Sequence, residues 1–332
     1  MIVNFVGNTT IGMSGEVADE THIVREMKDQ GHDVRFIPRD EWREYVIEKY
    51  PENKYKVPTN LKADINIICK WHHFYDGSFV KALKELSGAP VIYWVWDYMP
   101  AERTFPDWHL AMAKEADLFL SGEKSMEPDY RANGIRYYYF SFDSCDGNIK
   151  TYSELNKKYG VVFLGGYTEQ GDRIKYIQEI DKVSPVTAFA PNYQEWKKIG
   201  IRAEPAVWGE DFNRVVAESS IVLGFSGNTN CWGYWSNRVG KVLRAGGFLL
   251  HQFTPGMEIF LGKKMEYFSS IEEAKEKVKF YMENPEKRED IVKRALVDPD
   301  EYTSKRKVEQ LMILAERFVR EDKGKLWGDN LS

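Results

Sequence analysis

Short apolar segments of strand type alternate with amphipathic segments of helix type along almost the whole chain. One series of this alternation runs from the apolar segment 2–6 to the segment 135–142, and a second series begins at Val161. Strands that alternate with helices favour parallel sheets with helices on their faces, so we expect an α/β protein with two such sheets. A length of 332 residues exceeds the usual size of a single hydrophobic core, and we place one domain at residues 1–150 and a second at 151–302.

The segment from Gly233 to His251 carries the strongest local signal for a ligand site. It reads as an aromatic loop, a short helix that opens near Ser236, a Gly-Gly stop and an apolar strand. A serine at this position can cap free backbone amides, and the positive end of a helix attracts anions. Arg238 and Lys241 lie three positions apart on one face and add two positive charges, an arrangement that suits a diphosphate. The alternative is an amphipathic helix that packs on a sheet with both basic side chains in solvent.

The run WSNRVGKVLRAGGFLLHQFTPGMEIF, continued by EYFSSIEEAKEKVKFYMENPEKREDI, resembles the C-terminal half of the CgeB-like (spore-maturation type) glycosyltransferases, and the likeness extends in order over residues 161–294. That family has an Asn/Ser-Arg pair before a helix, a small-Gly-Gly-Phe-Leu strand and a Pro-Gly-x-Glu turn. The resemblance implies the GT-B fold, in which two Rossmann-like domains with parallel sheets face each other across a cleft and the C-terminal domain holds a nucleotide sugar. It also implies that the final helix, at about residues 303–320, packs back on the N-terminal domain. Many retaining GT-B enzymes carry two glutamates eight positions apart where this chain has Gly233 and Lys241.

The same resemblance points to donor-binding residues at the ends of strands in the second domain. A Gly-Gly turn after the strand at 161–164 lets the backbone approach a ligand closely, and the segment after the next strand is where GT-B enzymes commonly meet the nucleotide base. The turn at 254–258 starts a helix whose first amides and Glu258 would face ribose or sugar hydroxyls, although an acidic residue also suits the first turn of a helix electrostatically. The expected donor-binding residues are Gly165, Gly166, Tyr167, Asn192, Ser236, Asn237, Arg238, Lys241, Gly256, Met257 and Glu258.

Candidates for the acceptor side and for catalysis lie in the first half of the chain. Asp97 ends its strongest predicted strand, and doubly wound folds place their ligands at the carboxyl ends of strands. Related families also carry an Asp soon after the equivalent strand, so Asp97 is the candidate general base, the alternative being an Asp that caps the following turn. The two successive histidines at 72–73 point to opposite sides of an extended chain and make a poor metal pair. The expected acceptor-side residues are Gly12, Ser14, Gly15, His72 and Trp96.

Charge and composition limit the partners of the chain. The formal net charge is −5, with 18 basic against 24 acidic residues in 1–150 and 28 against 27 in the remainder. An acidic first half gives a nucleic-acid acceptor no support, although a limited basic strip would be enough to hold one base. Three scattered cysteines fit a reducing compartment, the N-terminus reads as a strand and not as a signal peptide, and no apolar run approaches the roughly twenty residues that span a bilayer. We therefore expect a cytoplasmic protein without a membrane span.

Together these patterns favour a nucleotide-sugar-dependent glycosyltransferase that moves a hexosyl or pentosyl group to an acceptor hydroxyl. Arg238 and Lys241 would stabilise the leaving diphosphate, and Asp97 would position or deprotonate the acceptor. No DxD-like pair stands out in a suitable loop, so we expect no metal and no cofactor beyond the nucleotide-sugar co-substrate, whose base stays open. The acceptor (small molecule, glycan, protein or modified DNA base) and the stereochemistry stay open too. The alternatives are a sugar-nucleotide epimerase or hydrolase on the same fold and a non-catalytic nucleotide- or glycan-binding GT-B module.

Overall fold

The computed structural model describes residues 1–9, 18–51, 54–69, 75–97, 106–141, 150–152, 156–169, 172–227 and 229–320. The chain divides into two compact units. The first unit contains Met1–Gly122, Met126–Phe140 and the chain from Lys305, and the second contains Glu123–Ser125 and Ser141–Ser304. The change between units therefore falls at residue 141, whereas the sequence places the boundary at residue 150.

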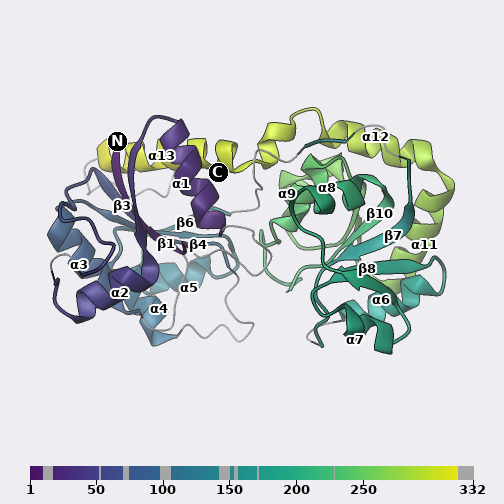
Figure 1. Ribbon diagram of the computed structural model, residues 1–332, viewed down its shortest axis with the longest axis horizontal. Helices are drawn as coiled ribbons and strands as arrows, with labels where there is room; N and C mark the ends of the chain where they lie inside the picture. The colour runs from purple at the N-terminus through teal and green to yellow at the C-terminus, as the bar shows by residue number, and fades with distance from the viewer. Residues whose placement is uncertain are drawn as a thin grey trace. The chain divides into compact units, whose positions relative to one another are not determined.

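The first unit is built on one parallel sheet with helices between its strands (Figure 1). Its elements are β1 (Ile2–Gly7), α1 (Asp19–Asp29), β2 (Asp33–Pro38), α2 (Arg39–Ile47), β3 (Ile65–Cys69), α3 (Gly77–Ser87), β4 (Val91–Val95), α4 (Asp107–Glu115), β5 (Leu118–Ser121), α5 (Glu127–Ala132), β6 (Tyr137–Tyr139) and α13 (Ser304–Arg320). The described strands follow the order β2-β1-β3-β4-β5-β6, and all neighbouring pairs are parallel.

The second unit repeats this architecture with a second parallel sheet (Figure 1). Its elements are β7 (Tyr159–Leu164), α6 (Arg173–Asp181), β8 (Val186–Ala190), α7 (Tyr193–Lys198), β9 (Arg202–Pro205), α8 (Gly209–Ala217), β10 (Ser219–Gly224), α9 (Arg238–Arg244), β11 (Leu249–Gln252), α10 (Met257–Phe260), β12 (Glu266–Phe268), α11 (Ile271–Glu283) and α12 (Pro285–Ala295), with 3-10 turns at Gly262–Lys264 and Pro299–Tyr302. The described strands follow the order β12-β11-β10-β7-β8-β9, again all parallel.

The second sheet is covered on both faces, which explains why its central strands are continuous apolar runs. Val161 and Phe163 of β7 point into a core shared with α6, α7 and α11, whereas Val162 and Leu164 point into a core shared with α8 and α9. Helices α6 and α9 therefore lie on opposite faces of the sheet. Ser270 caps α11, because its hydroxyl accepts from the Glu273 amide, and the Glu273 carboxylate accepts from the amide of Ser269, just before the cap.

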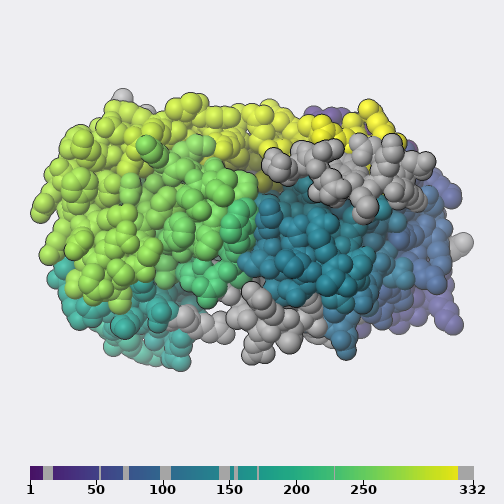
Figure 2. Space-filling model, turned by 180° about the vertical axis from the view of Figure 1, so that it is seen from behind, coloured from purple at the N-terminus to yellow at the C-terminus, as the bar shows by residue number. Residues whose placement is uncertain are grey.

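Helix α13 groups with the first unit although the whole second unit precedes it in sequence. The Gln30 carboxamide donates to the carbonyl oxygen of Lys305 at 3.1 Å, and the Arg136 guanidinium lies 5.7 Å from the ring centre of Phe318. Figure 2 shows the yellow end of the described chain beside purple and blue residues of this unit. The buried residues of α13 include Val308, Leu311 and Ala315, so a continuous apolar stripe packs this helix against the rest of the first unit.

The sequence gives no signal for two short elements of the second unit, namely α7 and the edge strand β9. In β9 only Ala203 is buried, and Arg202 and Glu204 are exposed. A strand of four residues with one buried position leaves no apolar run to detect in a sequence, and its charges and Pro205 protect an exposed sheet edge. Among the helices that the structure describes, none is both long and apolar enough to cross a membrane.

Candidate functional site

The second sheet reverses its direction of growth between β7 and β10. These strands are direct neighbours, but β7 continues through α6 to β8 on one side and β10 continues through α9 to β11 on the other. The two helices therefore leave adjacent strands in opposite directions. In open α/β sheets, ligands bind outside the carboxyl ends of the strands at such a switch point.

An arginine begins each of the two helices at the switch point: Arg173 begins α6 and Arg238 begins α9. Neither helix has an acidic residue in its first turn, whereas α7, α8, α10, α11 and α12 all do. A positive charge at the amino end of a helix opposes the helix dipole. Both helices thus lack the usual preference for acidic residues in the first turn, and they do so at the place where the topology predicts a ligand.

The Arg173 side chain extends over β7. Its Nη1 donates to the carbonyl oxygen of Gly166 at 3.3 Å, and its guanidinium lies 5.5 Å from the ring centre of Phe163. Its Nε is buried without a hydrogen-bond partner, and burial lowers the pKa of the guanidinium. Asp172, the preceding residue, is exposed, and the described residues place no carboxylate in an ion pair with Arg173.

Arg238 is half-buried, and its side chain has no ion-pair partner in the described part of the chain. Burial, and then the charge of Arg173, lowers the pKa of Arg238 to about 10, so Arg238 remains protonated at neutral pH. Two close guanidinium groups without a carboxylate repel each other and lack part of their hydration. This arrangement is stabilised by an anion that accepts from both.

His251, in β11, lies close enough to this pair to be affected by both charges. Burial lowers its pKa first, the charges of Arg238 and Arg173 lower it further, and the result is about 4, so the ring is neutral at pH 7. The ring fills space over Gly224, at the end of β10, where an added Cβ would lie 2.0 Å from His251 Cδ2. The site thus combines two guanidinium groups with one uncharged imidazole.

The predicted residues after β7 and β8 are linked by hydrogen bonds. The Tyr167 amide donates to the Asn192 side-chain oxygen at 2.8 Å, and the Asn192 side-chain nitrogen donates to the Tyr167 carbonyl oxygen at 2.9 Å. A Cβ on Gly165 would meet the Phe163 ring at 2.7 Å. The structure brings Gly165, Gly166, Tyr167 and Asn192 together, and the contact of Asn192 is with the backbone of the loop.

The aromatic loop before α9 packs against the turn after β11. Gly233 donates through its amide to the carbonyl oxygen of Pro255 at 2.8 Å. Gly256 has a φ of 96°, and a Cβ there would lie 3.1 Å from the Gly233 nitrogen, so this position favours glycine. Residues 123–125 join the same loop, because the Lys124 amide donates to the Trp232 carbonyl and the Trp232 amide donates to the Ser125 hydroxyl.

The polar groups of the predicted Pro-Gly-x-Glu turn are engaged within the turn. A Glu258 carboxylate oxygen accepts from the Gly256 amide at 2.9 Å, and the Met257 amide donates to the carbonyl oxygen of Thr254 at 3.2 Å. The Met257 side chain is fully buried. These contacts favour a role in holding the turn for Gly256, Met257 and Glu258, and their contact with a donor remains a prediction.

Helix α9 starts two residues after the expected opening near Ser236. The Ser236 hydroxyl, one residue before the N-cap Asn237, accepts from the Arg238 amide at 3.1 Å, and the carbonyl oxygen of Asn237 accepts from the Lys241 amide. One of the amides expected to face an anion is therefore satisfied by Ser236. The positive character of the site comes from the arginine side chains.

Among the candidates of the first unit, Asp97 and Trp96 are described. Asp97 follows β4 at the carboxyl end of the sheet and is half-buried. Trp96 is 7% exposed and packs edge-on against Trp94, with ring centres 4.6 Å apart, so it offers little surface to an acceptor. The other acceptor-side candidates, Gly12, Ser14, Gly15 and His72, lie outside the described residues.

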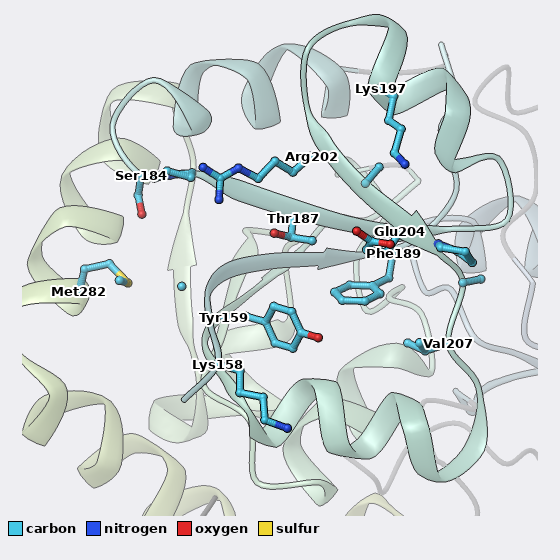
Figure 3. Close-up of a pocket in the computed structure, with 15 residues that line it drawn as sticks. Lys158, Tyr159, Ser184, Thr187, Phe189, Lys197, Arg202, Glu204, Val207 and Met282 are labelled. Atoms are coloured by element: carbon cyan, nitrogen blue, oxygen red, sulfur yellow. The ribbon is translucent and has the colours of Figure 1, made fainter. Parts of the chain in front are cut away.

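A cavity of about 910 Å³ also lies in the second unit, but it contains none of the predicted site residues. Figure 3 shows Tyr159, Thr187 and Phe189 facing it, Arg202 and Glu204 of the edge strand beside them, and Lys197 at its rim. It opens over the face of β8 and β9 and not at the switch point. We therefore place the candidate site at the two arginines, where topology and charge agree.

Of the three residues of this candidate site, the sequence proposes Arg238 as a donor contact and gives no role to Arg173 or His251. The available signal for Arg173 was a basic residue at the start of a helix whose first turn has no acidic residue, although Asp172 directly precedes it, and this signal becomes visible only when the helix boundary is known. For His251 there was no signal, because a histidine at the end of an apolar strand is compatible with any core.

The comparisons with known proteins agree with this architecture. Residues 172–313, a range that includes Arg173, Arg238 and His251, match a family model described as glycosyl transferase-like. HepE from Anabaena, in complex with UDP and glucose, is similar with a TM-score of 0.67 at 12% identity, over 95% of this chain and 99% of that chain. The fold is that of the GT-B glycosyltransferases.

Two other solved structures show the same GT-B likeness. Sucrose-phosphate synthase from Thermosynechococcus elongatus has a TM-score of 0.67 at 8% identity, over 96% of this chain and 98% of that chain. An alpha-glucosyltransferase in complex with UDP and a 13-mer DNA containing an HMU base has a TM-score of 0.62 at 9% identity, over 95% and 99%. The comparison with curated proteins finds no significant match. The predicted GT-B fold is thus confirmed, and the CgeB-like subtype remains a prediction.

Proposed function

We propose that this chain transfers a sugar from a nucleotide-diphosphate sugar to an acceptor hydroxyl, and that the second unit binds the donor at the carboxyl ends of β7 and β10. The observation that carries the proposal is the pair Arg173 and Arg238: two guanidinium groups at a topological switch point without a carboxylate partner among the described residues. The glycosyl transferase-like match spans both residues, and structures similar to this chain contain UDP or UDP-glucose.

On this proposal the two arginines bind the diphosphate and stabilise the charge that develops on it as the bond to the sugar breaks. They supply the positive charge that a metal ion would otherwise provide, so the transfer proceeds without a metal. The turn at Gly165–Tyr167, held by Asn192, lets its backbone lie close to the donor.

Asp97 is proposed to accept the proton of the acceptor hydroxyl as that oxygen attacks the sugar. Its place at the carboxyl end of β4 supports this role, since ligands of α/β sheets lie at that edge. The donor base follows from the nucleotide panel described below.

The first test is the binding of nucleotides by calorimetry or thermal shift, with UDP, GDP, dTDP, ADP and CMP compared and NAD as a negative control. One diphosphate should bind, and Arg173→Ala and Arg238→Ala should each weaken it about tenfold or more, because each removes hydrogen bonds between charged groups. Arg202→Ala is the matched control, since it removes an exposed arginine from the cavity of Figure 3, and it should leave affinity unchanged.

Unchanged affinity in both Arg173→Ala and Arg238→Ala would overturn the location of the donor site. Weaker binding in Arg202→Ala alone would move the site to the cavity at β8 and β9. A protein that binds the diphosphate but shows no transfer to any acceptor and no release of free sugar from the donor would not be an enzyme of this class.

A further inference from the structure

The carbonyl oxygen of Gln252 determines which ring nitrogen of His251 carries the proton and which is a hydrogen-bond acceptor. Nδ1 of His251 lies 2.6 Å from the carbonyl oxygen of Gln252, and because a carbonyl oxygen only accepts, Nδ1 carries the ring proton. In the neutral ring Nε2 is therefore a bare acceptor. Within the described ranges no group donates to Nε2.

Gly224 fixes the position of the ring. An added Cβ at Gly224 would lie 2.0 Å from Cδ2, 2.8 Å from Cγ and 3.0 Å from Nε2 of His251, so the Cδ2–Nε2 edge occupies the space that the glycine leaves at the end of β10. His251 is 2% exposed.

The neighbours of His251 determine what can bind to Nε2. His251 pairs with Gly224 at the carboxyl end of β10, one of the two strands of the switch point, so it lies at the same edge of the sheet as the proposed diphosphate site. A diphosphate only accepts hydrogen bonds and cannot bond to a bare nitrogen acceptor. A ligand can satisfy Nε2 only if it also brings an O–H or N–H donor close to the diphosphate.

We propose that Nε2 of His251 accepts a hydrogen bond from a hydroxyl group of the ligand whose diphosphate is bound by Arg173 and Arg238, and that this bond makes the site prefer a hydroxyl-bearing nucleotide over a bare diphosphate. The inference rests on the proposed function, because it requires the nucleotide diphosphate at the arginine pair. The hydroxyl belongs either to the ribose or to the transferred sugar. His251 is a specificity residue and takes no proton in the reaction.

The test compares the dissociation constants of pyrophosphate, of the best-binding nucleoside diphosphate of the panel and of its glucose conjugate. They are measured for the wild-type protein, His251→Leu and His251→Gln. His251→Leu removes the acceptor and should weaken the hydroxyl-bearing ligand about fivefold or more, whereas pyrophosphate should bind as before. His251→Gln restores an acceptor oxygen and should recover part of the affinity.

The ligands separate the two sources of the hydroxyl. A loss seen already with the nucleoside diphosphate assigns the hydroxyl to the ribose, and a loss seen only with the glucose conjugate assigns it to the transferred sugar. His32→Leu makes the same change in the first unit and should alter none of the constants. Thermal unfolding of each variant verifies that the second unit is intact.

Three outcomes overturn the inference. If His251→Leu binds all three ligands as tightly as the wild type does, the proposed hydrogen bond does not exist. If it loses affinity for pyrophosphate and nucleotide equally, His251 supports the arginines and recognises no hydroxyl. In both cases the proposed function stands if the arginine variants still lose binding. A wild-type protein that binds no nucleotide of the panel overturns the proposed function, and this inference with it.

Discussion

Asn192 holds the backbone of Tyr167 with both ends of its side-chain amide, one hydrogen bond being 2.8 Å and the other 2.9 Å long. The two residues come from the loops after β8 and β7, so this pair ties two adjacent strand ends together. It also sets the path of the Gly-Gly turn whose carbonyl oxygen at Gly166 accepts from Arg173. Asn192 thus acts on the arginine site through the loop.

Asn192→Ala should therefore lower both stability and affinity. The loss of two hydrogen bonds should lower the free energy of unfolding by about 1–3 kcal/mol, and a loosened turn should weaken nucleotide diphosphate binding. Asn192→Asp keeps the acceptor for the Tyr167 amide, but it turns a carboxylate oxygen towards the Tyr167 carbonyl oxygen and adds a negative charge near the diphosphate, so it should weaken binding at least as much as Ala. Denaturant unfolding and binding of both variants check this, and wild-type affinity in Asn192→Ala would contradict the mechanism.

Gly224→Ala should displace the imidazole of His251, because the new Cβ would lie 2.0 Å from Cδ2. Overpacking of this kind costs about 1–3 kcal/mol of stability. The cost should largely disappear in the background of His251→Ala, where no ring occupies the space. A double-mutant cycle on thermal unfolding measures the coupling, and additive effects of the two changes would mean that the contact carries no strain.

Asp97→Asn should spare nucleotide binding and lower the transfer rate about 10²-fold to 10⁴-fold, since an amide cannot accept the acceptor proton. Asp107→Asn, at the exposed start of α4, is the control and should leave the rate unchanged. Single-turnover kinetics with the donor found in the binding panel provide the measurement. Full activity of Asp97→Asn would assign the base to another residue and leave Asp97 as a turn residue.

Acidification should destabilise the first unit through His109. This fully buried ring lies between the hydroxyls of Tyr93 and Tyr130, at 3.1 and 2.9 Å, and burial lowers its pKa from 6.5 to about 3. Below pH 6.5 the unfolded chain takes up a proton that the native ring refuses, so stability falls as pH decreases towards 3 and is level above about 7. At pH 5 the loss is about 2 kcal/mol. The free energy of unfolding, measured by urea unfolding between pH 5 and 7.5, should change less with pH in His109→Phe than in the wild type. An equal dependence on pH in both proteins would exclude His109 as the cause.

The sequence predicted the two parallel sheets well, because their strands are apolar runs covered by helices on both faces, as in β7. It predicted β9 poorly, since an edge strand with one buried side chain leaves no periodic signal. It located Arg238 through the aromatic loop and the Gly-Gly stop that bracket α9.

The sequence does not show which polar groups form hydrogen bonds with residues distant along the chain. Asn192 suits a nucleotide base by position, but the structure shows its side chain bonded to Tyr167. Met257 stands in a turn expected to face the donor, yet its side chain belongs to the core. Arg173 becomes a candidate only through the order of the strands, which brings the starts of α6 and α9 to one switch point.

Because α13 belongs to the first unit but follows the second unit in sequence, the order of synthesis affects how the chain folds on the ribosome. Residues from Lys305 onward leave the ribosome after the whole second unit, so the apolar surface that α13 will cover stays exposed on the first half of the chain while the second unit is synthesised. The second unit needs only 123–125 from the earlier part of the chain and can finish first. A nascent chain that stalls before Lys305 therefore exposes an unfinished first unit to aggregation and proteolysis beside a completed second one.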